Sequence, residues 1–465
     1  MFFTILHAVN GYLLYRFMLQ LSDYWKVNIP QIIALGATFI FLLHPYSVEP
    51  VVWRVCVHYL ISTIQVMLVL ILYLSYLQTA KRQHLYLGGL IYLVSLFTLE
   101  VSFITPVVLG LAGLIIWWTG ENKRSIFTRT LLYGGMLFGL LGGYLLLNKI
   151  TLGNVVGHYG AQVHLRLDFL TMAATEFKYL VKHLFFARLY SYNAKGLLFD
   201  KVLSMPVVTF FITTLIISIS VLYFIKIKKL HPKWHLAFFG LMASILFVLP
   251  VSNIFFFHLH YGMNDRYSYI PIAFLVISVA ALAAHGKKWI SYSILGLLLL
   301  ISIYWQQRIL SYWNQSTQVL QALKEKFIWH DAPYVFILNS PDNFHGTVTA
   351  SILDEPSGID ELLDYQTSKP YTGKMFDVFQ YNMTLITDGA HVEQTGPMQI
   401  KVTFNQWGNW WHRNGIGAGT YENEYYKAEL LDHPYLLTFK QFPEGSVIIY
   451  QDGKEWKEFR FSGEG

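Results

Sequence analysis

Long apolar stretches dominate the first 306 residues and restrict what this chain can fold into. Only 8 of the 28 acidic residues lie before residue 316, so little charge interrupts these stretches. An apolar stretch of about 20 residues is long enough to span a bilayer as a helix. We therefore predict a polytopic α-helical membrane bundle of about ten helices. They fall near residues 1–20, 29–43, 57–79, 85–98, 101–118, 129–148, 203–224, 234–251, 268–285 and 289–306.

The last 150 residues have a different character. Residues 316–465 carry 20 of the 28 acidic residues but only 11 of the 34 Lys and Arg. A short helix is expected at 316–327, a turn at 339–343 and a second helix at 358–367. Alternating apolar patterns predict strands at 334–338, 383–387, 399–404, 434–440 and 446–450. We predict a membrane domain over residues 1–310 and a small, mainly β (α+β) soluble domain over 316–465.

The basic residues before residue 316 fall mostly in alternate connections between the apolar stretches, which is a signal of topology rather than of nucleic-acid binding. The basic connections lie at 26, 81–82, 123–129, 226–233 and 287–288. We expect these on the cytoplasmic side, and the C-terminal domain on the outer side. Met1 then also lies outside. Either the N-terminus is outside, or a further helix precedes this sequence; we expect the second.

The segment between two apolar stretches at residues 44–58 concentrates polar and aromatic side chains. Such groups are costly at a bilayer and often mark a functional site. This segment should lie in an outer loop. Its candidate site residues are His44, Glu49, Trp53, Arg54 and His58.

A second outer loop, residues 149–202, is too long for a simple connection. Residues 175–190 alternate basic side chains such as Lys178 and Lys182 with apolar ones. This pattern predicts an amphipathic helix that lies in the membrane interface. The helix is either a lid over the bundle or one wall of an entrance for a lipid substrate.

Further candidates come from two other outer segments. Glu100 interrupts an otherwise uncharged stretch, so it either pairs at a helix end or lines a polar cavity. Asp265 precedes the helix at 268–285 and is a plausible N-cap. Arg266 is our first choice for a phosphate contact, because a guanidinium binds phosphate strongly. Tyr267 is expected to support it. The single cysteine, Cys56, excludes an intramolecular disulfide.

Several of these residues form a pattern that resembles a known family. Leu43, His44 and Pro45, followed by Glu49 and Trp53, resemble a loop of the GT-C superfamily of membrane glycosyltransferases. The nearest resemblance is to the transmembrane tetratricopeptide-repeat O-mannosyltransferases and their bacterial relatives. Other blocks agree in order and spacing, namely Leu6 to Asn10, Thr98 to Pro106, Leu249–Asn253 and Asp265–Pro271.

This resemblance implies a glycosyltransferase, a hexosyltransferase that uses a polyprenyl-phosphate-linked sugar. Transfer would be to a protein or glycan acceptor on the outer face of a bacterial inner membrane, with no metal or other cofactor required. Glu49, Glu100 and His44 would be catalytic. Arg266, Arg54 and His58 would bind the donor phosphate, and Trp53, Asp265 and Tyr267 would support them. In that family an acidic loop precedes the segment that Met1 begins.

Two other classes of function stay open on the sequence alone. The first is a membrane protein that binds or transports a lipid-linked glycan without catalysis. The second is a carbohydrate-binding module on a membrane anchor, with Trp407, Trp410 and Trp411 beside His412 as its stacking surface. Such aromatic residues are also common in domain cores.

Overall fold

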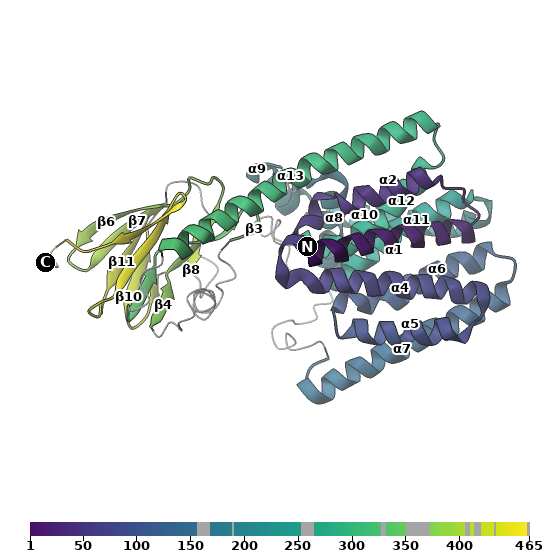
Figure 1. The fold of residues 1–465 in the computed structure, drawn as a ribbon, viewed down its shortest axis with the longest axis horizontal. Helices are drawn as coiled ribbons and strands as arrows, with labels where there is room; N and C mark the ends of the chain where they lie inside the picture. Colours follow the sequence, from purple (N-terminus) through teal and green to yellow (C-terminus); the bar gives the residue numbers. More distant parts are fainter. Residues whose placement is uncertain are drawn as a thin grey trace. The chain divides into compact units, whose positions relative to one another are not determined.

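The computed structural model describes residues 1–155, 168–187, 190–252, 265–326, 332–349, 373–404, 410–412, 420–431 and 434–462. The chain divides into two compact units, Met1–Gln307 and Arg308–Gly465. The first unit is a bundle of helices and the second contains the strands (Figure 1). The predicted fold class, a helical membrane-type bundle followed by a region with sheets, is confirmed at this level.

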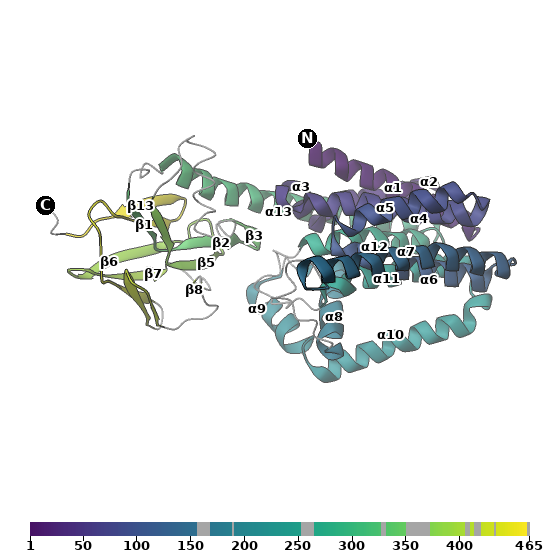
Figure 2. The same cartoon turned by 90° about the horizontal axis from the view of Figure 1, so that it is seen from below.

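Most of the long helices of the first unit lie side by side, and several of them are joined by connections of a few residues (Figures 1 and 2). Short 3₁₀ segments and one π-helical segment, η6, occupy several of the connections. The helices are α1 (Phe2–Tyr24), α2 (Gln31–Leu42), η1 (Pro45–Ser47), α3 (Val48–Val52), η2 (Arg54–Cys56), α4 (Val57–Thr79), α5 (Arg82–Leu96), η3 (Glu100–Ile104), α6 (Thr105–Thr119), α7 (Lys123–Leu152), α8 (Phe169–Phe185), α9 (Tyr192–Lys195), η6 (Gly196–Val202), α10 (Pro206–Lys226), η7 (Ile227–Lys229), α11 (Pro232–Val248), η8 (Leu249–Val251), η9 (Asp265–Ser268), α12 (Tyr269–Ala283) and α13 (Lys288–Lys326).

Among the described residues, seven helices are long and apolar enough to cross a membrane, or eight if the bent pair 31–42 and 45–52 forms one span. This supports a membrane protein but does not confirm the expected count of about ten. Helix α5 has 15 residues, which is shorter than a bilayer requires. Helix α1 has the length, but His7, Asn10 and Arg16 interrupt its apolar sequence and it is not among the seven.

Helix α12 is the centre of the bundle, with nearly all of its residues buried. It packs along α11 and also contacts α2 and α4. Gly240 on α11 permits this close approach. A Cβ at Gly240 would lie 2.5 Å from Ser278 Oγ and 2.7 Å from the carbonyl oxygen of Phe274. The two helices therefore pack nearly backbone to backbone.

Buried hydrogen bonds join four helices near the start of α12. His7 Nδ1 lies 2.6 Å from the hydroxyl of Tyr269, and His7 Nε2 lies 2.9 Å from the carbonyl oxygen of Leu42. The amide of Asn10 donates to the carbonyl of Leu60 at 2.9 Å and to the Tyr269 hydroxyl at 3.2 Å. Polar contacts of this kind hold helices together where lipid surrounds them. They fix the segment before α12, which carries Asp265 and Arg266.

The second unit begins with the end of α13. That helix runs without a break from Lys288 to Lys326, so the separate short helix expected at 316–327 is wrong. Val319 and Leu323 on its last part are buried against Val335 and Trp456. The apolar face of the helix end therefore belongs to the core of the strand region.

The described strands form three sheets, with the orders β13-β12-β1-β4, β6-β7-β11-β10-β9 and β3-β2-β5-β8. Strand β1 lies between β12 and β4, parallel to both, and is buried. The strands are β1 (Tyr334–Ile337), β2 (Ser340–Phe344), β3 (Thr347–Val348), β4 (Lys374–Asp377), β5 (Phe379–Met383), β6 (Ala390–Gly396), β7 (Gln399–Phe404), β8 (Trp410–His412), β9 (Tyr421–Glu422), β10 (Tyr426–Leu430), β11 (Pro434–Phe439), β12 (Val447–Asp452) and β13 (Glu455–Phe459).

Most predicted strands of this unit are present, but the expected turn at 339–343 is wrong. Residues 340–344 form strand β2, which pairs with β5 and β3. Asn339 precedes β2. Its side-chain amide donates to the backbone carbonyl of Gln451 at 2.8 Å, and its Oδ1 accepts the backbone N–H of Gln451 at 2.8 Å. The side chain of Asn339 therefore bonds to the backbone of the neighbouring strand β12, instead of to its own backbone as in a turn.

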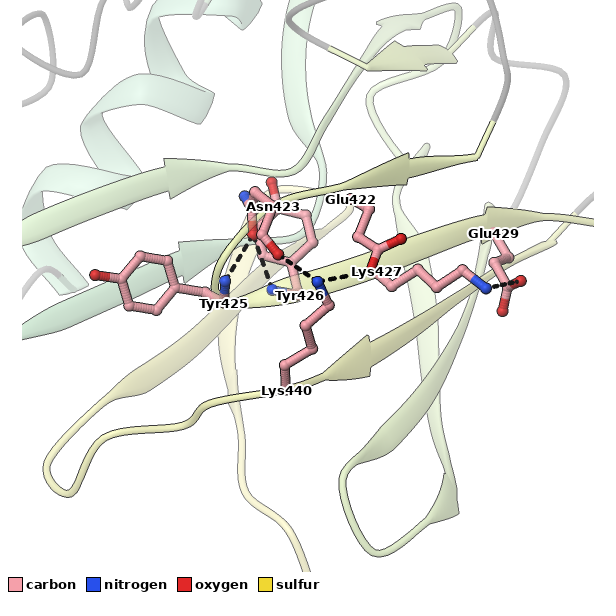
Figure 3. A network of polar contacts seen from close by, with 7 residues as sticks. All are labelled: Glu422, Asn423, Tyr425, Tyr426, Lys427, Glu429 and Lys440. Carbon is pink, nitrogen blue, oxygen red and sulfur yellow. Dashed lines mark hydrogen bonds and ion pairs between the residues drawn. The ribbon is translucent and has the colours of Figure 1, made fainter.

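Polar contacts at the surface link the outer strands of the five-stranded sheet (Figure 3). The side chain of Asn423 accepts backbone hydrogen bonds from Tyr425 and Tyr426 at 2.9 and 2.8 Å. Lys440 pairs with Glu422 at 2.6 Å. These groups are solvated, so such pairs add little stability. We assign this network no function beyond shaping the loop.

Two sequence predictions cannot be followed in the structure. The expected helix at 358–367 and Trp407 both lie outside the described residues. Trp410 and Trp411 belong to β8, which pairs with β5. The hypothesis of an aromatic sugar-binding surface there stays a prediction.

Candidate functional site

Four charged residues from three segments meet at one end of the helix bundle. They are Glu49 on α3, Lys182 on α8, and Asp265 and Arg266 on η9. More than 200 positions of sequence separate Glu49 from Arg266. We call these four residues the charged cluster. Figure 2 shows α3 and α8 at the same end of the bundle.

The first half of the charged cluster is a bidentate contact between Glu49 and Arg266. Arg266 Nη1 lies 2.8 Å from Glu49 Oε1, and the backbone N–H of Arg266 donates to Glu49 Oε2 at 3.1 Å. Glu49 is buried, whereas the side chain of Arg266 keeps 22% of its surface exposed. The buried carboxylate therefore binds a guanidinium group that is still partly accessible from outside the bundle.

Aromatic rings complete the surroundings of Arg266. Its guanidinium carbon lies 5.4 Å from the ring centre of Trp53 and 4.8 Å from that of Tyr267. Cation–π contacts of this length hold the guanidinium plane in place. Tyr267 in turn packs edge-on against Tyr59 at 6.0 Å. The predicted supporting residues Trp53 and Tyr267 thus do lie against the predicted phosphate ligand.

The second half of the charged cluster is a fully buried ion pair. Lys182 Nζ lies 2.7 Å from Asp265 Oδ1, and both side chains are 0% exposed. The ammonium also lies 4.9 Å from the ring centre of Tyr46 and 5.5 Å from that of Tyr179. Asp265 does not cap α12 as expected, because the N-cap position is Ser268. Its carboxylate serves the lysine of α8 instead.

Helix α8 directs its polar face toward the bundle rather than toward water. Its buried side chains include Lys178, Lys182 and His183, while Phe169 and Phe185 are exposed. The predicted amphipathic helix is present as α8, whereas its position in the membrane interface stays a prediction. The observed arrangement brings basic groups to the site, while the apolar side chains at the two ends of the helix stay exposed.

Two further ionisable groups of α8 are buried without a hydrogen-bond partner among the described residues, namely His183 and Glu176. Burial and the nearby charge of Lys182 hold the pKa of His183 well below its ordinary range. Burial raises the pKa of Glu176 well above its ordinary range. His183 is therefore neutral near pH 7, and burial favours the protonated form of Glu176. Perturbed groups of this kind concentrate at functional sites.

His44 is a structural cap in this arrangement. Its Nδ1 accepts the backbone N–H of Tyr46 at 3.2 Å and so begins η1. Its ring stacks on Phe186, with centres 5.3 Å apart. The histidine therefore joins the 44–58 segment to the end of α8. A catalytic role for His44 stays a prediction.

The other predicted site residues lie toward the rim. Arg54 and Glu100 are exposed, and His58 is half-buried within electrostatic range of Arg266 and Glu100. The structure thus brings Glu49, Trp53, Asp265, Arg266 and Tyr267 together and leaves Arg54 and Glu100 apart.

The sequence analysis missed Lys182, His183 and Tyr46 as site residues. A signal was present, since Lys178 and Lys182 are four positions apart and so share a helix face with each other. The pattern does not reveal which face turns inward. Among the described residues, no group of three or more His, Cys, Asp or Glu is arranged to hold a metal ion.

Comparisons with protein-family models, with curated proteins and with solved structures found no significant match to this chain. A function for this chain must therefore be inferred from the charged cluster and from the motifs in the sequence.

Proposed function

We propose that this chain is a membrane glycosyltransferase of the GT-C type, which transfers a sugar from a polyprenyl-phosphate donor to an acceptor hydroxyl. The observation that carries the proposal is the charged cluster, where a partly exposed arginine is held by a buried carboxylate at one end of an apolar bundle. The sequence blocks that resemble the family supply its residues Glu49, Asp265 and Arg266. A bacterial inner membrane, with this end outward, is part of the proposal.

Arg266 binds the donor phosphate in this proposal, supported by the positive charge of Lys182 behind it. A phosphate oxygen then replaces the Glu49 carboxylate on the guanidinium, because both bind through the same N–H groups. Trp53 and Tyr267 hold the guanidinium plane while its partner changes. The lipid chain of the donor remains in the bilayer beside the exposed apolar side of α8.

Glu49 then acts as the general base. It accepts the proton of the acceptor hydroxyl as that oxygen attacks the anomeric carbon of the sugar. The bond from the anomeric carbon to the phosphate oxygen breaks, and polyprenyl phosphate leaves with the electron pair. The new glycosidic bond keeps the acceptor oxygen. No metal or cofactor enters this step.

Binding of polyprenyl monophosphate tests the phosphate site without knowledge of the sugar or the acceptor. Purified chain in neutral detergent should bind this lipid, and Arg266→Gln should weaken binding by about two orders of magnitude, as for loss of a charge-assisted contact. Arg124→Gln is the matched control, because Arg124 is an exposed arginine in the first turn of α7.

Equal loss in both variants would contradict a specific phosphate site. Binding without turnover of any sugar-loaded donor would instead support the alternative of a protein that binds lipid-linked glycan without transferring it.

A further inference from the structure

A polar cavity lies at the opposite end of the bundle from the charged cluster. Helix α1 connects the two ends, since His7 bonds to Leu42 at one and Tyr24 lies at the other. The cavity has a volume of about 720 Å³. It is an open recess bounded by the end of α1, the turn between α6 and α7, and η7 with the start of α11. Nothing in the proposed transfer reaction uses it.

The cavity is basic. Lys26, Lys123 and Lys228 line it from three separate connections, and Glu121 is the one carboxylate among its described lining residues. These three lysines are exposed on the rim. Three cations against one anion favour an anionic ligand.

A buried hydrogen-bond donor also points to a ligand. Trp25 lines the cavity and is 6% exposed, yet its indole N–H has no acceptor among the described residues. Buried donors of this kind are nearly always satisfied. A phosphate oxygen in the cavity would accept this hydrogen bond.

An apolar groove adjoins the cavity. It has a volume of about 460 Å³ and is lined by α10 residues, with Met242 from α11 and Trp118 from α6. Trp118 lines both the groove and the cavity, so the two spaces share one wall. Helix α10 is mostly exposed and apolar, as expected for a helix that faces lipid. A basic recess joined to an apolar groove matches an amphiphile with an anionic head.

We propose that this cavity and groove bind one phosphate-headed membrane lipid, with its head among Lys26, Lys123 and Lys228 and one acyl chain along α10. The lipid is an anionic phospholipid rather than a soluble phosphate, because the groove adds apolar contact that only a chain can use. This site is independent of the proposed transfer reaction, and either can fail without the other.

Native mass spectrometry of the full chain in neutral detergent tests the proposal. Phosphatidylglycerol should bind more tightly than phosphatidylcholine with the same acyl chains. Replacement of all three cavity lysines, Lys26→Gln, Lys123→Gln and Lys228→Gln, should weaken phosphatidylglycerol binding by about tenfold or more, since each lysine near an anionic headgroup contributes severalfold.

The matched control is Lys81→Gln, Lys229→Gln and Lys287→Gln. It removes the same charge from exposed lysines in the same set of connections, none of which lines the cavity. Its affinity should stay within about twofold of the parent, as expected for charges outside a site. Equal weakening in both triple variants would overturn the proposal in favour of diffuse surface attraction.

Ile217→Trp tests the groove. Ile217 lines the groove and is 57% exposed, so a larger side chain fills the groove without entering the core. Phosphatidylglycerol binding should fall in this variant, while the elution volume on size exclusion stays unchanged. If glycerol 3-phosphate competes as well as the lipid does, or if Ile217→Trp binds normally, the lipid assignment is wrong.

Discussion

The buried pair of Lys182 and Asp265 makes the most quantitative prediction. With atoms 2.7 Å apart, their gross attraction at an effective dielectric constant of 20 is about 6 kcal/mol. Removal of both ions from water offsets most of this. Removal of one partner, however, leaves the other buried and uncompensated, which costs about 3–5 kcal/mol.

Lys182→Met should therefore destabilise the chain by about 3–5 kcal/mol, whereas Lys182→Met combined with Asp265→Leu should lose less than about 2 kcal/mol. The assay is reversible unfolding in mixed micelles with increasing dodecyl sulfate, followed by tryptophan fluorescence. Lys201→Met, at an exposed lysine of the same long loop, should stay within about 0.5 kcal/mol of the parent.

A double variant as unstable as Lys182→Met alone would refute this reasoning, because the cost would then not come from the unpaired carboxylate. A decrease of less than about 1 kcal/mol in the free energy of unfolding of Lys182→Met would also refute it, because solvent-exposed ion pairs contribute that little.

Three further predictions concern packing and pH. Gly240→Ala should lower the free energy of unfolding by about 1–3 kcal/mol, because the new Cβ meets Ser278 and the backbone of Phe274; the same mixed-micelle titration measures it, and an unchanged midpoint would contradict the packing of α11 on α12. His183 has a lowered pKa in the folded chain, so its stabilising effect is complete above about pH 6.5 and is lost as the pH falls below that value. Below that pH, the free energy of unfolding of His183→Phe should fall less steeply than that of the parent, by up to about 1.4 kcal/mol per pH unit. Equal slopes in the two proteins would contradict the burial of a neutral ring. Glu176 has a raised pKa, so its cost grows as the pH rises above about 4.5; Glu176→Gln should stabilise the chain by more than about 1 kcal/mol at pH 7 and by nothing at pH 4.5, and a constant difference would refute this.

Local patterns in the sequence predicted the elements well where one physical signal dominated. Length and hydropathy predicted most of the spans, and alternation predicted strands such as β7 and β11. The limits of the apolar stretches predicted that Glu49 and Arg266 lie in connecting segments, and the basic residues of the alternate connections predicted both segments on the outer side. That these two residues meet in space was expected only because charged groups are costly at a bilayer and because the family resemblance places both in one site. No local rule joins positions 49 and 266.

Three failures have physical reasons. Lys182 was not expected in the site, because the pattern of α8 does not reveal that a carboxylate on η9 pairs with it inside the bundle. Asp265 was expected as a cap, and this long-range partner outweighed the local role. Residues 340–343, expected as a turn, are extended within β2 because Asn339 bonds to β12, a contact that local propensity cannot include.

The central claim is that the charged cluster transfers a sugar from polyprenyl phosphate with Glu49 as the base. Its most direct test is the release of polyprenyl phosphate from radiolabelled polyprenyl-phosphate hexoses, measured with the full chain in proteoliposomes that also contain membrane acceptors. We predict turnover by the parent chain and a loss of at least about a hundredfold in Glu49→Gln, with donor binding retained. Turnover that is unchanged in Glu49→Gln would contradict the account.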